Sequence, residues 1–221
     1  MSDLLYVQSS PRRAESESRR LADSFLHAFR TVAPAATIDV FDLWDDPLPV
    51  FAGDHVAAKM AVIGGSTPDG RQATAWDGIT RVYERFADAD AYLFTVPMWN
   101  HGVPWVLKHL IDTITQPGLA FGFDVGTGYE GLLEGKRATA IYTSAIWPTF
   151  GDDFHSAYFE SWLRFVGIDE IHSVRLGSNL LDGEIEQARA RARADAAELG
   201  GRFALEAAQR PEAASREAAS C

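Results

Sequence analysis

The sequence predicts an α/β fold, in which an open, five-stranded parallel sheet carries helices on both of its faces. Two observations lead to this prediction. Five short apolar segments have the length of buried strands, and the stretches between them carry apolar residues at helical spacing. Strands that alternate with helices along one chain are typical of a single parallel sheet covered on both sides.

The strands are expected where short apolar runs end in small or polar residues. The clearest is residues 91–96, AYLFTV, which runs into Pro97. Residues 37–43, TIDVFDL, alternate apolar and polar side chains, and Pro47 and Pro49 interrupt regular structure after them. The five expected strands are residues 3–8, 37–43, 91–96, 137–144 and 169–176.

Helices are expected between and after these strands. In the first of them Leu21, Phe25 and Phe29 recur at helical spacing. The segment 51–72 contains several glycines and is expected to form a short helix and an exposed loop, and the Gly-rich segment 118–135 a hairpin. The longer expected helices are residues 15–32, 73–87, 103–115, 154–166 and 182–208.

Length and composition indicate one domain. The chain has 221 residues, of which 47% are hydrophobic, so it can bury a sizeable core. We assign residues 1–208 to this single domain. Residues 209–221 are low in apolar side chains, and we expect them to form a disordered tail.

Charge and composition disfavour several kinds of partner. The formal net charge is −11, and an acidic surface repels the phosphates of nucleic acids and anionic lipids. No apolar run approaches the roughly 18 residues of a membrane span. The first residues are too few and too acidic for a signal peptide, and the only cysteine, Cys221, cannot form an internal disulfide. We therefore expect a cytoplasmic protein with neither nucleic acid nor membrane as its partner.

The fold class also predicts where a ligand binds. Ligands of open parallel sheets lie beyond the carboxyl ends of the strands, where the strand order reverses. The loops after the first, third and fourth expected strands are therefore the candidate site: residues 9–18, 97–102 and 144–150.

The first of these loops is rich in hydroxyl groups and runs into a helix. Ser10, Ser16 and Ser18 can donate hydrogen bonds, and a helix N-terminus adds unpaired N–H groups and a positive dipole end. This combination suits a phosphate monoester. The alternative is that these serines only cap the helix. Neither the GxGxxG nor the GxxxxGK[ST] phosphate motif is present, which disfavours a dinucleotide as the main cofactor.

The second loop has the chemistry that a flavin ring requires. Met98 and Trp99 supply a flat, polarizable surface, Asn100 both a donor and an acceptor, and Gly102 room for close backbone approach. The alternative for Met98 and Trp99 is core packing. His101 stands without companion ligands, so no metal site is expected.

Taken together, four segments resemble the FMN-dependent NADH-azoreductases of the flavodoxin-like quinone reductase superfamily. They are LLYVQSSPRRAESES, PMWNHGVPWVLKHLIDTI, GLAFGF and EGLLEGKRATAIYTS, and the likeness extends over most of residues 3–205. The resemblance implies a flavodoxin-like fold, bound FMN, a nicotinamide donor (NADH or NADPH) and two-electron reduction of quinones and azo compounds. It also implies a homodimer with the flavin sites at the subunit interface.

The resemblance assigns site residues position by position. Phosphate contacts correspond to Ser10, Ser16, Glu17 and Ser18, and contacts to the isoalloxazine correspond to Met98, Trp99, Asn100 and His101. We assign Pro97 and Gly102 of the same loop to the cofactor site with them. The third loop contributes Ser144, Ala145, Ile146 and Trp147. Positions that line the acceptor pocket in the family correspond to Phe121 and Trp162, and core packing is the alternative for both.

The sequence departs from the family pattern at three places. The family's usual Tyr and Phe are replaced by Trp99 and His101, and its Ser-Arg-Gly-Gly becomes residues 144–147, Ser-Ala-Ile-Trp. Backbone N–H contacts to a flavin survive these changes, whereas an arginine side-chain role does not. His101 becomes a candidate proton donor, because the unperturbed pKa of histidine is about 6.5. Substrate preference is therefore open.

The mechanism implied by the resemblance is hydride transfer through flavin N5, with donor and acceptor binding in turn in a ping-pong scheme. Three alternatives remain at this point. One is a dedicated natural-product quinone reductase with incidental azo activity, and another is a flavodoxin-like electron carrier. The third is a binding module without flavin.

Overall fold

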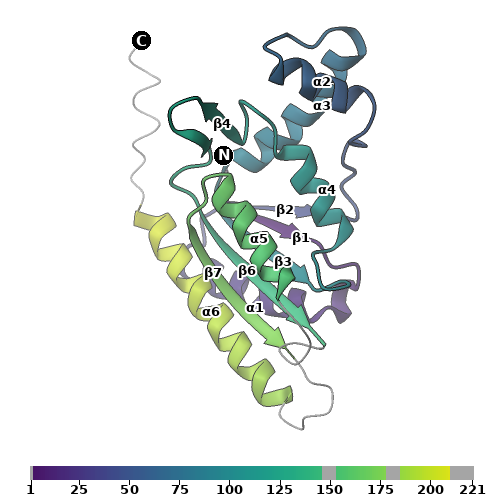
Figure 1. Cartoon of the computed structure of the whole chain (residues 1–221). Coiled ribbons are helices and arrows are strands. Elements are labelled where there is room, and N and C mark those ends of the chain that lie inside the picture. Colours follow the sequence, from purple (N-terminus) through teal and green to yellow (C-terminus); the bar gives the residue numbers. More distant parts are fainter. Residues whose placement is uncertain (1, 146–152, 178–184, 210–221) are drawn as a thin grey trace.

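The computed structural model describes residues 2–145, 153–177 and 185–209, and it has the α/β architecture that the sequence predicts. Five parallel strands form one sheet in the order β2-β1-β3-β6-β7 (Figure 1). Renumbered among themselves, these strands run 2-1-3-4-5, the flavodoxin-like order. The strands are β1 Ser2–Gln8, β2 Ile38–Asp42, β3 Ala89–Pro97, β6 Arg137–Ser144 and β7 Glu170–Gly177.

The helices also lie where the sequence places them. The short helix expected within residues 51–72 is α2, and the final expected helix is described from Ile185 onwards. The expected tail, residues 209–221, lies outside the described residues except for Gln209, which ends α6. The helices are α1 Glu17–Val32, α2 Asp54–Ile63, α3 Gly70–Ala87, α4 Trp105–Ile114, α5 Phe154–Phe165 and α6 Ile185–Gln209, with a 3-10 turn η1 at Arg13–Glu15.

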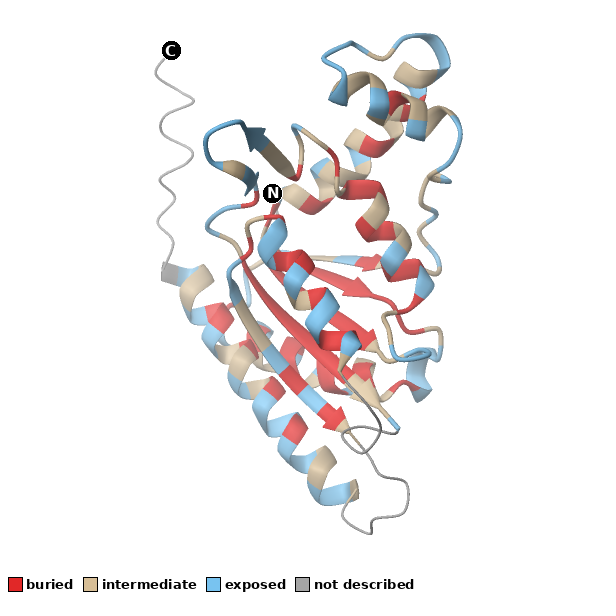
Figure 2. Ribbon diagram, in the orientation of Figure 1, coloured by how far each residue is buried: buried red, intermediate tan, exposed pale blue. Residues whose placement is uncertain are grey.

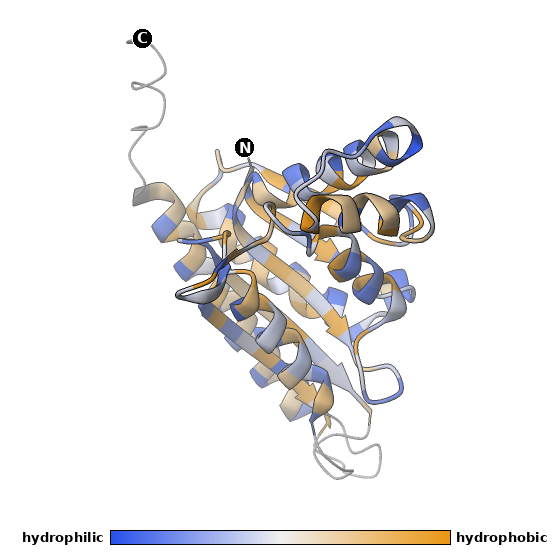
Figure 3. Cartoon of the chain, turned by 45° about the horizontal axis from the view of Figure 1, so that its top comes forward, coloured by the Kyte–Doolittle hydropathy of each residue, from blue (hydrophilic) through white to orange (hydrophobic). Residues whose placement is uncertain are grey.

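The sheet separates two hydrophobic cores. Along β1, Leu5 and Val7 face the core formed with α3, α4 and α5, whereas Leu4 and Tyr6 face the core formed with α1 and α6. This alternation follows from the two-residue period of a strand. Figure 2 shows the central strands largely buried, and Figure 3 shows them largely hydrophobic. Because both faces are covered, the strand ends and their loops are where the sheet can meet a ligand.

Helices α1 and α6 pack unusually closely at one glycine. A Cβ atom added to Gly200 of α6 would lie 2.1 Å from the carbonyl oxygen of Phe25 in α1. The next residue, Gly201, has nothing within 4 Å of such an atom. Glycine is therefore required at position 200 by the approach of a neighbouring backbone, and it is not required at position 201.

The Gly-rich segment between α4 and β6 forms the expected hairpin. Strands β4 (Phe121–Asp124) and β5 (Gly128–Gly131) pair antiparallel. Gly131 packs against the backbone of Gly167, where a Cβ atom would have no space. The hairpin carries exposed aromatic side chains at one end of the molecule (Figure 1).

Candidate functional site

Three loops meet at a cavity of about 360 Å³ beyond the carboxyl ends of β1, β3 and β6. The chain passes from β1 outward to β2 and returns to β3 on the other side of β1, so the strand order reverses there. The cavity is lined by Ser10, Arg12, Ser16, Glu17, Pro97, Met98, Trp99, Thr143, Ser144, Ala145, Leu176, Ile185 and Arg189. The fold thus brings together eight of the fourteen predicted cofactor-binding residues at this cavity.

The remaining predicted residues lie nearby or elsewhere. Ser18 is buried directly behind the cavity, with its Oγ 3.0 Å from that of Ser16. Asn100 lines a second cavity, and His101 is exposed. Ile146 and Trp147 fall outside the described residues.

The first loop is held firmly at its start. The backbone N–H of Ser9 donates to Thr95 Oγ1 at 3.2 Å, and the Ser9 hydroxyl donates to the Thr95 carbonyl. Ser16 then caps α1, because its Oγ accepts a hydrogen bond from the Arg19 N–H at 3.3 Å. Ser16 therefore caps α1 and also lines the cavity, where phosphate binding stays a prediction.

The second loop contains a tight two-residue turn. Trp99 and Gly102 exchange backbone hydrogen bonds of 2.9 Å in both directions, and φ is 50° at Asn100 and 66° at His101. Positive φ at both central residues is typical of a type I′ turn, which glycine and asparagine favour. A non-glycine residue held there costs on the order of 1–2 kcal/mol, and such strain is often found at functional sites. The turn is anchored by the Met98 N–H, which donates to the Thr143 carbonyl at 2.8 Å.

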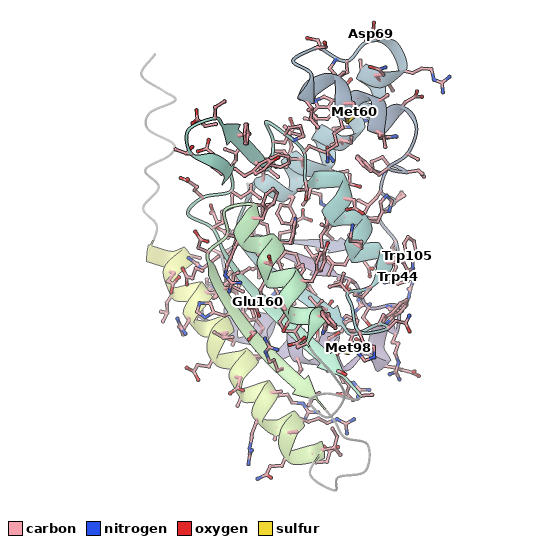
Figure 4. The ribbon with its side chains drawn as sticks, viewed as in Figure 1. Trp44, Met60, Asp69, Met98, Trp105 and Glu160 are labelled. Carbon is pink, nitrogen blue, oxygen red and sulfur yellow. The ribbon has the colours of Figure 1, made fainter. Side chains whose placement is uncertain are left out.

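Tryptophan side chains connect this turn to its surroundings. The ring of Trp44 lies 5.9 Å from that of Trp99 and 5.6 Å, at a near-perpendicular angle, from that of Trp105. The indole N–H of Trp44 donates to the Ser9 carbonyl at 3.0 Å. Figure 4 shows Met98 near the carboxyl ends of the strands, with Trp44 and Trp105 together beside it. Trp44 therefore joins the first two loops, a role that its sequence position did not reveal.

A second, larger cavity of about 770 Å³ begins on the other side of Trp99. Its walls are mainly aromatic and aliphatic, and Trp105 and Val50 are 59% and 73% exposed. His109 is held in place by a hydrogen bond of 2.8 Å between its Nε2 and the Pro49 carbonyl. The lining residues are Val50, Phe51, Trp99, Asn100, Val103, Trp105, Lys108, His109 and Asp112.

Positive charge collects at the serine end of the first cavity. Arg12 and Arg189 line it together with one carboxylate, Glu17. Arg189 Nη2 donates to Glu17 Oε1 at 2.7 Å, so this carboxylate is paired. Hydroxyls, a helix N-terminus and two guanidinium groups are the donors that a phosphate requires.

A polar cluster supports the opposite edge of the site. Asp153 caps α5 by accepting from the Ser156 N–H at 2.9 Å, and Arg175 Nη1 donates to Asp153 Oδ2 at 2.9 Å. Burial lowers the pKa of His155 to about 4, and its ring lies 5.1 Å from that of Tyr142 in an edge-on arrangement. His155 is therefore neutral near pH 7 and has the role of a core residue.

The two predicted acceptor-pocket residues lie away from both cavities. Trp162 is 6% exposed, packs in the core beside Phe86 and Phe159, and donates its indole N–H to Thr115 Oγ1 at 2.9 Å. These contacts are those of a core residue, and a role in the acceptor pocket stays a prediction. Phe121 lies in the hairpin within an aromatic cluster that includes Tyr129 and Phe165.

Sequence reasoning missed several lining residues. Leu176 lies near the end of β7, and the strand-end rule could have indicated it. Ile185 and Arg189 belong to α6, far from the loops in sequence. Nothing local distinguishes Arg189 from Arg191 or Arg193 in the same helix.

The sequence of residues 2–199 matches the model of a protein family that is described by its flavodoxin-like fold. The chain belongs to this family. It is 44% identical, over 82% of its own length and 91% of the relative's, to a protein of Ruegeria pomeroyi named FMN-dependent NADH:quinone oxidoreductase. A protein of Desulfotalea psychrophila with the same name is also 44% identical, over 82% of this chain and 88% of the relative.

Solved structures agree with this family assignment at the level of the fold. The crystal structure of an azoreductase from Bacillus anthracis superposes with a TM-score of 0.83, covering 92% of this chain and all of the other, at 23% identity. Within the described residues of this flavodoxin-like protein, no helix is both long and apolar enough to cross a membrane. Nor do three or more His, Cys, Asp or Glu side chains gather there as a metal site would require.

Proposed function

We propose that the protein is an FMN-dependent NADH:quinone oxidoreductase. The observation that carries this proposal is the cavity at the reversal of strand order, which has hydroxyls and guanidinium groups at one end and Met98 and Trp99 at the other. A ligand with a phosphate at one end and a planar ring at the other fits this division. The family relatives that are 44% identical over most of their lengths carry the name of this activity.

The residues at the two ends of the cavity are of the kinds that FMN requires. Ser10 and Ser16 line the phosphate end, Ser18 supports Ser16, and the ring end is formed by residues 97–102 with Ser144 and Ala145. Bound FMN supplies the ability to take up and release two electrons as hydride. The chain's own contribution is to fix the ring: the Met98 N–H is bound to β6, and the type I′ turn holds Asn100 and His101 in one conformation.

The second cavity supports a planar aromatic acceptor. Phe51, Trp99 and Trp105 give it aromatic walls, and it adjoins the ring end of the first cavity through Trp99. We propose that nicotinamide and quinone occupy this space in turn, which gives ping-pong kinetics. His101 is exposed beside it and can pass a proton between water and the acceptor oxygen.

The apolar surface around the second cavity also supports a homodimer. Val50 and Trp105 are largely exposed on the wall of this cavity, and exposed apolar side chains that gather in one place are typical of interaction sites. We propose that a second copy covers this surface in the cytoplasm and completes the acceptor site. Analytical ultracentrifugation tests the dimer, and a protein that sediments as a monomer at micromolar concentration contradicts it.

The acceptor class is tested by steady-state kinetics with NADH against a panel of quinones and azo dyes. Parallel lines in double-reciprocal plots and higher kcat/KM for quinones are expected. We propose quinones as the main substrate, because the relatives that are 44% identical carry the name of quinone oxidoreductases. Azo dyes turned over faster than every quinone would contradict this preference.

A further inference from the structure

Arg189 reaches the phosphate end of the candidate site from a different part of the chain. It lies near the start of α6, on the wall of the first cavity that also contains Ser10 and Ser16. Figure 1 shows this end of α6 beside the carboxyl ends of β6 and β7. A helix that covers one face of the sheet thus also contributes a charged group to the site.

The guanidinium group of Arg189 is held in place by two carboxylates, and some of its N–H groups have no partner among the described residues. Its Nη2 donates to Glu17 Oε1 at 2.7 Å, and its Nη1 pairs with Glu186. Its Nε is buried and has no hydrogen-bond partner among the described residues. Each of its two terminal nitrogens carries two N–H groups, and the two carboxylates accept one from each. The other terminal N–H groups can donate to an acceptor atom in the cavity that Arg189 lines.

Neighbouring charges show why this arginine differs from others nearby. Arg193 lies one turn further along α6, is exposed and does not line the cavity. Arg12 lines the cavity, but its side chain is 67% exposed and lies 3.9 Å from Glu15. Arg189 is 28% exposed and is positioned by Glu17.

Glu17 would repel a bound anion, and its pairing with Arg189 reduces that repulsion. Glu17 lies in the first turn of α1, so its carboxylate would repel a phosphate drawn to that helix end. Pairing with Arg189, together with a longer contact of 3.4 Å to Arg20, neutralises Glu17 and leaves the N–H groups and dipole of α1 available to an anion. Because Glu17 is paired, an anion can bind at this end of α1 although an acidic side chain lies beside it.

We propose that Arg189 binds the phosphate of the flavin cofactor, donating from the terminal N–H groups that Glu17 and Glu186 do not use. This inference rests on the proposed function, because FMN is the phosphate ester concerned. It makes α6 part of the cofactor site. It also gives the protein a means of preferring FMN to riboflavin, which lacks the phosphate.

The test compares two flavins across matched variants. Dissociation constants for FMN and riboflavin are measured by quenching of flavin fluorescence for the wild type, Arg189→Gln and Arg193→Gln, each checked for folding by circular dichroism. Loss of a hydrogen bond between charged groups costs about 1.5–3 kcal/mol, so Arg189→Gln should weaken FMN binding roughly 10- to 150-fold. Riboflavin binding should change by less than about twofold, and Arg193→Gln should leave both constants near wild type because it only removes a distant charge.

Several outcomes would overturn the proposal. They are an equal loss of affinity for both flavins in Arg189→Gln, an equal loss in Arg193→Gln, and full recovery of FMN binding when Glu17→Gln is added to Arg189→Gln. The last would mean that Arg189 acts only by neutralising Glu17. Failure of the wild type to bind FMN would instead contradict the proposed function, so the two failures are distinguishable.

Discussion

The close contact between α1 and α6 predicts that one added Cβ atom changes the stability of the fold, and the surroundings of that atom decide whether stability rises or falls. Replacing Gly200 with alanine adds a Cβ that would lie 2.1 Å from the Phe25 carbonyl oxygen and 2.8 Å from its carbonyl carbon. These are backbone atoms of a helix, so they cannot rotate away, and the two helices must separate. The change is expected to destabilise the fold, although alanine favours helix more than glycine does.

The magnitude follows from two opposing effects. Overpacking a well-packed core costs typically about 1–3 kcal/mol, whereas glycine to alanine in a helix interior gains about 1 kcal/mol. Because this clash involves backbone, we expect the upper part of that range and a net loss of about 1–2 kcal/mol. Gly201→Ala is the matched control, since nothing lies within 4 Å of its added Cβ, and it should gain up to about 1 kcal/mol.

The measurement is urea unfolding followed by circular dichroism at the helix band, supported by thermal melts. The two variants should differ by about 2–3 kcal/mol, which corresponds to roughly 4–12 °C in Tm for a chain of this size. A Gly200→Ala variant as stable as Gly201→Ala would refute the reasoning. It would mean that the helices are not held at the separation described.

Three further predictions concern single side chains. His155 is buried and its pKa is lowered to about 4, so as pH falls below about 6.5 the unfolded chain binds a proton at this histidine before the folded chain does. The free energy of unfolding should therefore drop on the order of 3 kcal/mol between pH 6.5 and 4. In urea unfolding at several pH values, His155→Asn should remove this part of the pH dependence. Arg85 makes two hydrogen bonds of 2.8 Å to Asp39 and lies over the ring of Phe41, so Arg85→Met should lower the free energy of unfolding by about 1–2 kcal/mol in the same assay. The control is Arg71→Met, which removes an ion pair whose arginine is 88% exposed and should cost less than about 0.5 kcal/mol. His101→Gly removes the strain of a φ of 66° and should raise the free energy of unfolding by up to about 1 kcal/mol. The same variant should lower quinone turnover near neutral pH, and unchanged turnover with every acceptor would argue against a role of His101 in proton transfer.

The fold could be predicted from the sequence because its signals are local. Buried strands, helical spacing of side chains such as Phe25 and Phe29, and glycines in the hairpin each report on their own segment. The position of the site followed from topology, since parallel strands end at one edge of the sheet. These rules placed the first two loops at the cavity lined by Ser10, Met98 and Trp99.

The contacts that complete the site could not be predicted in the same way. Trp44 follows a strand without distinctive spacing, yet it contacts Trp99 and Trp105 from another part of the chain. Arg189 looks like any arginine on an exposed helix until α6 is placed against the sheet. Trp162 fits both a pocket and a core by its residue type, and its packing against Phe86 of α3 depends on how the helices are arranged. Such contacts depend on how distant segments are arranged in space.

The most direct test of the proposed function is to purify the protein, add FMN, remove oxygen and titrate with NADH while recording the visible spectrum. If the cavity holds FMN as proposed, the flavin should bind at micromolar concentration or tighter, its bands should bleach in one two-electron step, and a quinone should restore them. A protein that binds no FMN under these conditions, or whose bound flavin NADH cannot reduce, would contradict the account.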